Sequence, residues 1–130
     1  SAMPARDREI LSSKGFGPVV AMRHQGAIAK AVRHVLANFR GEIRVEDLLK
    51  LTGMSRATFA RQFKQHAGRT LSEFVNKVRL QSACRELAET DASVTEIAMN
   101  CGFGEISFFN RLFRREKGCS PREYRTNKRS

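Results

Sequence analysis

The chain has 130 residues, of which 41% are hydrophobic, so it can form one compact domain or two very small ones and is not expected to be disordered throughout. Lysine and arginine outnumber aspartate and glutamate by 24 to 13, and the net charge of +11 favours a polyanionic partner, nucleic acid first and an anionic membrane surface second. No apolar run approaches the roughly 18 residues that span a bilayer, and the N-terminus lacks the apolar region of a signal peptide.

The first 23 residues are expected to lie outside the folded part of the chain. Residues 1–3 have the form of a remnant left by protease cleavage ahead of a start methionine. The stretch up to residue 23 contains two prolines and two glycines without helical periodicity, so we expect an arm or linker, with at most a short helix near residues 5–12. The chain is therefore expected to begin inside a longer protein.

Residues 24–70 are predicted to form a first unit of three helices. The first helix is expected over residues 25–39, and Gly41 ends it. Its apolar stripe comprises Ile28, Ala31, Val32, Val35 and Leu36. Four basic side chains lie off this stripe and are read as a solvated face, with phosphate contact as the alternative: Arg23, Lys30, Arg33 and Arg40.

Two further helices of this unit are expected on either side of Gly53. The helix before it begins without a serine or threonine cap, although Glu46 and Asp47 in its first turn suit the positive end of the helix dipole. The helix after it is expected over residues 55–67. Together with the two residues that follow, this helix contains four basic side chains and no acidic one.

A longer helix is predicted over residues 71–89 as a linker between two units. Its apolar stripe comprises Phe74, Val75, Val78, Ala83 and Leu87. At 1.5 Å per residue the helix is about 28 Å long.

Residues 90–127 are predicted to form the second unit. Ser93 and Glu96 have the spacing of a capping box, and Gly102 stands where a left-handed residue ends that short helix. The next helix turns Phe109, Leu112 and Phe113 inward, and a last helix begins at Ser120, Pro121 and Glu123. Two helices around a glycine turn, the second with a basic polar face, describe a helix-turn-helix.

The two units repeat one pattern. Three residues recur 49 positions later: Val45, Leu48 and Gly53 correspond to Val94, Ile97 and Gly102. Five more recur 50 positions later: Phe59, Arg61, Phe63, Lys64 and Gly68 correspond to Phe109, Arg111, Phe113, Arg114 and Gly118. The repeat indicates two copies of one supersecondary unit, the second with one extra residue in or after its turn.

The second unit resembles the signature of the AraC/XylS family of bacterial transcription regulators. The resemblance is carried by Ile97, Ala98, Gly102, Phe103, Ser107, residues 109–114, Gly118, Ser120, Pro121, Tyr124 and Arg125. Over residues 24–127 it implies an all-α fold of about seven helices, two helix-turn-helix units joined by a long linker helix. The chain departs from the family pattern at Leu49, Glu86 and Glu105, where the family has a small, an apolar and an aspartate residue. Because Glu86 replaces an apolar residue of the family, that edge of the linker helix is expected to be exposed.

Two sets of side chains are the candidate DNA contacts. The base-contact candidates are Arg56, Ala57, Thr58, Ala60, Arg61, Ile106, Ser107, Phe108, Asn110 and Arg111. Arginine can bind guanine, asparagine can bind adenine, and apolar groups can touch thymine methyls. The phosphate candidates are Lys64, Gln65, Arg69, Arg114, Arg115 and Arg122. The whole basic stretch of residues 114–129, up to the basic tail at 128–130, is expected to anchor phosphates as well.

The resemblance implies a sequence-specific regulator that binds double-stranded DNA as a monomer, in two successive major grooves about one DNA turn apart. It implies the C-terminal output domain of an effector-responsive activator, working with RNA polymerase in the bacterial cytoplasm and on the nucleoid when bound. Effector binding and dimerisation would belong to a further N-terminal domain. The alternatives are a small stand-alone regulator, the DNA-binding module of a repair protein, and a helical bundle that binds other proteins.

Neither an enzyme nor a metal site is expected. Cys84, Cys101 and Cys119 lack metal-binding spacing and are read as reduced, non-catalytic thiols, the first two in the core. The sequence contains no phosphate-binding loop and no nucleophile–base motif, so we expect no cofactor.

Overall fold

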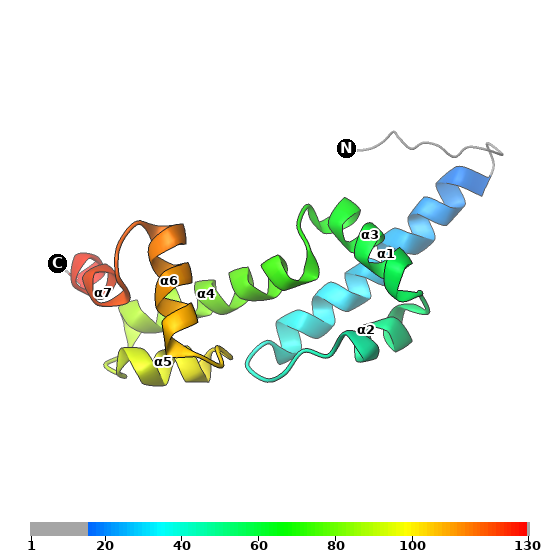
Figure 1. Ribbon diagram of the computed structural model, residues 1–130. Helices are drawn as coiled ribbons and strands as arrows, with labels where there is room; N and C mark the ends of the chain where they lie inside the picture. Colours follow the sequence, from blue (N-terminus) through cyan, green and yellow to red (C-terminus); the bar gives the residue numbers. More distant parts are fainter. Residues whose placement is uncertain (1–15, 130) are drawn as a thin grey trace. The chain divides into compact units, whose positions relative to one another are not determined.

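Residues 16–129, the part of the chain that this computed structural model describes, form seven α-helices and no β-strand (Figure 1). The helices are α1 (Phe16–Asn38), α2 (Val45–Thr52), α3 (Arg56–Ala67), α4 (Leu71–Glu89), α5 (Val94–Asn100), α6 (Ile106–Lys117) and α7 (Pro121–Arg129). The predicted all-α class and the bounds of the linker helix, α4, are confirmed.

The helices belong to two compact units. The first contains α2, α3 and α1 as far as His34, and the second contains α4 to α7 together with Val35–Arg44, the last turn of α1 and the loop after it. Within the second unit α4 lies against α5 and α7, and α6 packs on the same two helices (Figure 1).

The first helix is longer than the sequence predicted. It begins at Phe16 and not near residue 25, so the expectation of an arm up to residue 23 was wrong for its last eight residues. Pro18 lies in the first turn, where backbone N–H groups have no intrahelical partner, and a proline there removes no hydrogen bond. The short helix predicted near residues 5–12 lies outside the described residues.

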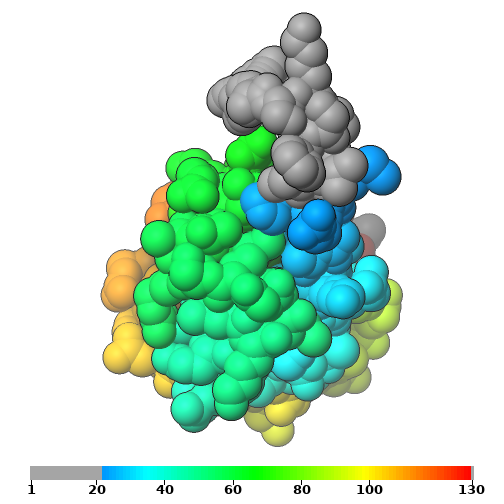
Figure 2. All heavy atoms as spheres, turned by 90° about the vertical axis from the view of Figure 1, so that its right-hand side faces the viewer, coloured from blue at the N-terminus to red at the C-terminus, as the bar shows by residue number. Residues whose placement is uncertain are grey.

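The first unit packs α1 against the helix pair α2–α3. Figure 2 shows the atoms of α1, in blue and cyan, directly beside those of α2 and α3, in blue-green and green. The buried apolar side chains are Ile28, Ala31, Leu48, Phe59 and Phe63. Leu36, which the predicted stripe of α1 included, is 52% exposed, because the buried Val35 continues the i, i+4 row from Ala31 and the next residue points about 100° away.

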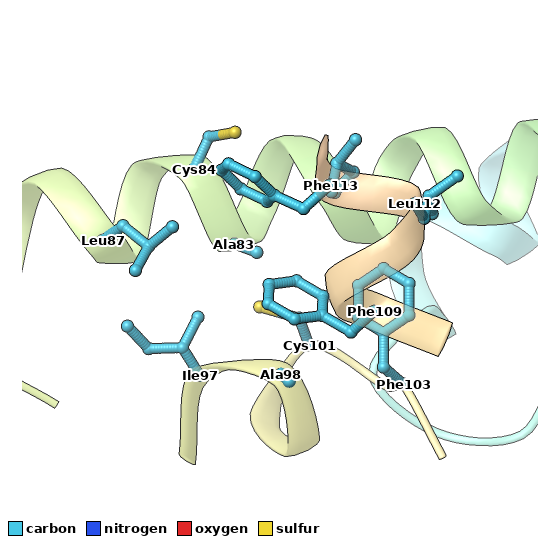
Figure 3. Close-up of a cluster of buried hydrophobic side chains, with 11 residues drawn as sticks. Ala83, Cys84, Leu87, Ile97, Ala98, Cys101, Phe103, Phe109, Leu112 and Phe113 are labelled. Atoms are coloured by element: carbon cyan, nitrogen blue, oxygen red, sulfur yellow. The ribbon is translucent and has the colours of Figure 1, made fainter. Parts of the chain in front are cut away.

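The core of the second unit is a continuous cluster from α4, α5 and α6 (Figure 3). Its aromatic rings follow one another: centroid distances are 4.9 Å from Phe103 to Phe109, 5.6 Å from Phe109 to Phe113, and 5.4 Å from Phe113 to Tyr124. These spacings suit tilted and edge-to-face contacts. Cys84 and Cys101 are buried in this cluster, as predicted. The packing of the whole cluster fixes α6 on α4 and α5.

Gly102 ends α5 in a Schellman motif. Its φ is +98°, its N–H donates to the carbonyl of Met99 at 3.1 Å, and the N–H of Phe103 donates to that of Ala98 at 3.0 Å. A Cβ atom here would lie 2.4 Å from the carbonyl oxygen of Phe39 and 2.7 Å from Nε of Arg79. The position therefore requires glycine for its backbone angle and for the close approach of a neighbouring loop.

Arg79 holds that loop. Its Nε donates to the carbonyl of Phe39 and its Nη2 to that of Gly41, both at 2.8 Å. These carbonyls belong to the loop that follows α1, so the guanidinium fixes this loop against α4.

The same loop carries an ion pair that the sequence did not predict. Arg40 donates to Glu86 at 2.9 Å, to the carbonyl of Asn100 at 3.0 Å and to Oγ of Ser82 at 3.1 Å. The expectation of an exposed edge at Glu86 was wrong, because only 20% of its side chain is exposed and Arg40 pairs with its charge. The solvated face predicted for Arg40 is therefore wrong, because three protein groups bind its guanidinium.

We predict that Gly102→Ala destabilises the second unit more than Gly118→Ala. Both glycines have positive φ, but nothing lies within 4 Å of a Cβ built at Gly118. The backbone angle alone should cost about 1 kcal/mol, and the added overlap should bring the cost at Gly102 to about 2–3 kcal/mol. Urea unfolding followed by circular dichroism measures both, and equal losses would mean that the loop yields without cost.

Candidate nucleic-acid interface

The α3 helix has defined ends and one buried face. Ser55 caps it by accepting a hydrogen bond from the N–H of Thr58 at 3.2 Å, and Gly68 ends it in the left-handed conformation. Phe59 and Phe63 are buried, with ring centroids 5.6 Å apart. Because these two buried rings fix the helix on the core, its opposite face is exposed to solvent.

The outer face of α3 carries most of the candidates predicted for it. The exposed ones are Arg56, Ala57, Ala60, Arg61, Lys64 and Gln65. Thr58 is half-buried and contacts Oγ of Ser55 through its own hydroxyl at 3.0 Å, and Arg69, just beyond the helix, is also half-buried. On the inner side the structure buries Gln62, whose amide oxygen lies 3.2 Å from Nε2 of His66, a contact that the apolar pattern did not predict.

The α6 helix repeats this arrangement. Its buried residues are Phe109, Leu112 and Phe113, and Gly118 ends it as Gly68 ends α3. The exposed candidates are Ser107, Asn110, Arg111, Arg114 and Arg115, and Arg122 is exposed on α7. Ile106 and Phe108 are half-buried against the core cluster, with the ring of Phe108 6.2 Å from that of Phe103. Part of each apolar surface is therefore used for packing.

The internal repeat is confirmed in three dimensions. Leu48 and Ile97 are fully buried at equivalent places, and Gly53 and Gly102 both have positive φ. The segment between the paired helices is longer in the second unit, with residues 101–105 between α5 and α6. Leu49 is only half-buried where the equivalent alanine of α5 is fully buried, so the larger side chain is accommodated at the surface.

Ion pairs divide the candidate cations into two groups. Arg56 pairs with Glu46 at 3.3 Å, Arg114 with Glu123 at 3.7 Å, and Arg115 with Glu116 at 3.2 Å. Within the described residues, Arg61, Arg111 and Lys64 form no ion pair. Exposed pairs of this kind contribute little stability, so they do not prevent these arginines from contacting DNA.

Two basic residues near the C-terminus serve the fold. Arg125 donates to the carbonyls of Leu87 at 3.0 Å and Ala92 at 2.6 Å. Arg129 donates to Asp91 at 2.8 Å and to the carbonyl of Thr90. The sequence predicts phosphate binding for the whole basic stretch of residues 114–129, and these two side chains bind the protein instead. The missed signal is that α4 ends without a glycine, which leaves its last carbonyls in need of other donors.

The described residues offer little for other chemistry. No three metal-binding side chains come together in them, and none of their helices is long and apolar enough to cross a membrane. Burial raises the pKa of the Cys84 and Cys101 thiols, which keeps both protonated and unreactive.

The fold and the two basic outer faces define a helix-turn-helix DNA-binding domain. A family model described as a helix-turn-helix domain matches residues 48–127. The chain is 44% identical over 88 residues to the transcriptional activator RhaS of Enterobacter sp. strain 638, a match that covers 68% of this chain and 32% of that protein. The chain belongs to the AraC/XylS family of transcription regulators, and spans about a third of the length of the curated relatives that it matches.

Solved structures share the architecture. A probable AraC-family regulator from Rhodopseudomonas palustris has a TM-score of 0.74 and 31% identity, with 81% of this chain and 99% of that chain covered. The DNA-binding domain of AdpA, solved in complex with a target DNA, has a TM-score of 0.69 and 33% identity, with 82% and 93% covered.

Acid should weaken the first unit through His66. Burial, and secondarily repulsion from His24, lowers the pKa of His66 below its ordinary value of 6.5. A depressed pKa means that folding favours the neutral imidazole. The stability that His66 gives to the folded state is therefore complete above about pH 6.5 and is lost as pH falls through the folded-state pKa. Between pH 7.5 and 5.5 the melting temperature should fall less for His66→Gln than for the wild type. Equal falls would show that other groups cause the acid sensitivity.

Proposed function

We propose that this domain binds double-stranded DNA as a monomer, with α3 and α6 in two successive major grooves. The observation that carries the proposal is the structural equivalence of these helices. Each rests on a buried phenylalanine pair, is stopped by a left-handed glycine, and turns a basic face to solvent. A recognition helix reads base edges from the N-terminal half of such a face.

Base readout is assigned to the candidates in those N-terminal halves. Arg61 and Arg111 each come two residues after an inward phenylalanine, which on a helix is about 200° away from the core. Either guanidinium can form the bidentate bond to guanine O6 and N7, and Asn110 can bond adenine. The half-buried Ile106 and Phe108 retain enough exposed surface to touch a thymine methyl.

Phosphate binding is assigned to cations farther along each helix. Lys64 and Arg114 come one turn after Arg61 and Arg111, the two arginines assigned to base contacts. The set is completed by Gln65, Arg69, Arg115 and Arg122. Contacts of this kind set affinity and register without distinguishing sequences. Arg114 leaves Glu123 when it binds a phosphate, a loss that an exposed pair 3.7 Å apart makes small.

The domain is proposed to be the C-terminal output part of a longer activator. Its relatives are named transcriptional activators, and the matched region is about a third of their length. In this proposal the rest of the protein binds an effector and dimerises, and the DNA-bound protein contacts RNA polymerase in the bacterial cytoplasm.

A footprint and a salt titration test this proposal. Because two reading helices occupy successive grooves, the protected region should be about 20 base pairs on one face of the duplex. If six or more phosphates are neutralised, the slope of log K against log salt should be about −5 or steeper. Protection of a single groove would contradict the binding of α3 and α6 in two successive grooves. A salt slope near zero would contradict DNA as the binding partner.

Specificity should separate from affinity in four variants. The test uses a duplex selected from a random pool for tight binding to the wild type, and a scrambled duplex. We expect Arg61→Ala or Arg111→Ala to cost about 1–3 kcal/mol of binding free energy on the selected duplex and less on the scrambled one. Lys64→Ala or Arg114→Ala should weaken both duplexes by similar factors and reduce the salt slope by about one. Titrations at two salt concentrations distinguish these results. Equal losses on both duplexes for the first pair would make those arginines phosphate contacts.

A further inference from the structure

Glu46 places a carboxylate beside the start of the first recognition helix. It lies in the first turn of α2, and its Oε2 is 3.3 Å from Nη2 of Arg56, the first residue of α3. Both side chains are largely exposed, at 56% and 63%. The end of α3 that enters the groove therefore carries a paired arginine, whereas Arg61 in the same helix forms no ion pair with the described residues.

We propose that Glu46 is a specificity-determining residue, which positions Arg56 toward a guanine edge and reduces its attraction to phosphate. The inference rests on the proposed binding of α3 in a major groove. Glu46 acts through Arg56, and is therefore a positioning residue with no contact of its own to a base.

The donor geometry of the guanidinium allows both contacts at once. Arginine has five N–H donors in a planar fork, and a single carboxylate oxygen at Nη2 occupies one of them. The remaining donors suffice for a bidentate bond to O6 and N7 of guanine. At the first position of a helix, an arginine has few neighbours that restrict its rotamers, so the carboxylate narrows the directions in which the fork points.

The electrostatics favour bases over phosphates. A phosphate attracts an arginine chiefly through net charge, and the Glu46–Arg56 pair has none. A guanine edge binds through aligned hydrogen bonds, which the pairing leaves in place. The carboxylate therefore weakens the attraction of Arg56 to phosphates on every sequence. On a site with a guanine opposite Arg56, the oriented bond to that guanine offsets this loss. The difference in affinity between cognate and unrelated DNA grows as a result.

The second unit shows that this pair is particular to the first. Thr95 and Ile106 occupy the equivalent positions in α5 and α6, so neither charge is repeated there. The acidic residue in the first turn of α5, Glu96, accepts the N–H of Ser93 at 2.9 Å in the capping box. A carboxylate at a helix start is thus used for capping in one unit and for an arginine in the other.

Five proteins test the inference on the duplex selected from a random pool and on a scrambled duplex, at two salt concentrations. They are the wild type, Glu46→Gln, Asp47→Asn, Arg56→Ala and the double variant Glu46→Gln/Arg56→Ala. Asp47→Asn is the matched control, because it removes the same charge from the same turn of α2 and Asp47 is exposed and pairs with no described residue.

Glu46→Gln should raise affinity for the scrambled duplex about three- to tenfold, leave the cognate affinity within about twofold, and steepen the salt slope by about one, the share of one phosphate. Asp47→Asn should change both affinities by one common factor. In the Arg56→Ala background, Glu46→Gln should lose its effect on specificity. Melting temperatures monitor folding throughout.

The outcomes separate the two proposals. If the wild type does not distinguish the duplexes, sequence-specific binding fails and the inference falls with it. If the wild type distinguishes them but Glu46→Gln behaves as Asp47→Asn does, the positioning role is overturned while DNA binding stands. An unchanged ratio of affinities in Arg56→Ala would overturn it as well.

Discussion

The second unit depends on one guanidinium and the glycine beneath it. Arg79 binds two carbonyls of the loop after α1 and thereby draws the oxygen of Phe39 to a place where any Cβ at Gly102 would collide with it. That glycine also terminates α5 and directs the chain toward α6. The loop after α1, the end of α5 and the start of the chain toward α6 are therefore fixed at one point, which leaves little freedom for any of the three.

Aromatic packing converts this fixed start into a fixed surface. The rings of Phe109 and Phe113 lie 5.6 Å apart, and the same distance separates Phe59 from Phe63 in the first unit. A helix held at two points one turn apart resists rotation about its own axis. Arg61, Asn110 and Arg111, which lie between the rings, then face solvent, whereas Gln62 is buried. The direction in which each candidate arginine leaves the protein is therefore set by the packing of buried aromatic side chains.

The sequence predicted what depends on local rules. Capping at Ser93, the left-handed conformation of Gly102 and the inward phenylalanines follow from spacing and backbone angles, and the structure confirms them. The sequence could not predict interactions between residues that lie far apart in the chain. A charged residue in a sequence does not show which residue will pair with it. The sequence therefore predicts a solvated Arg40, although Glu86 pairs with it. The DNA contacts remain predictions, because exposure permits a contact and does not demonstrate one.

The arginines that close the end of α4 change the meaning of a common experiment. Arg125 and Arg129 lie at the end of the described chain and look like the disposable basic tail of a DNA-binding protein. Shortening the chain before Arg125 would strip the hydrogen-bond donors from carbonyls at the far end of α4. Such a truncation would lower DNA binding as the loss of phosphate contacts does, while the underlying defect would be a partly unfolded second unit.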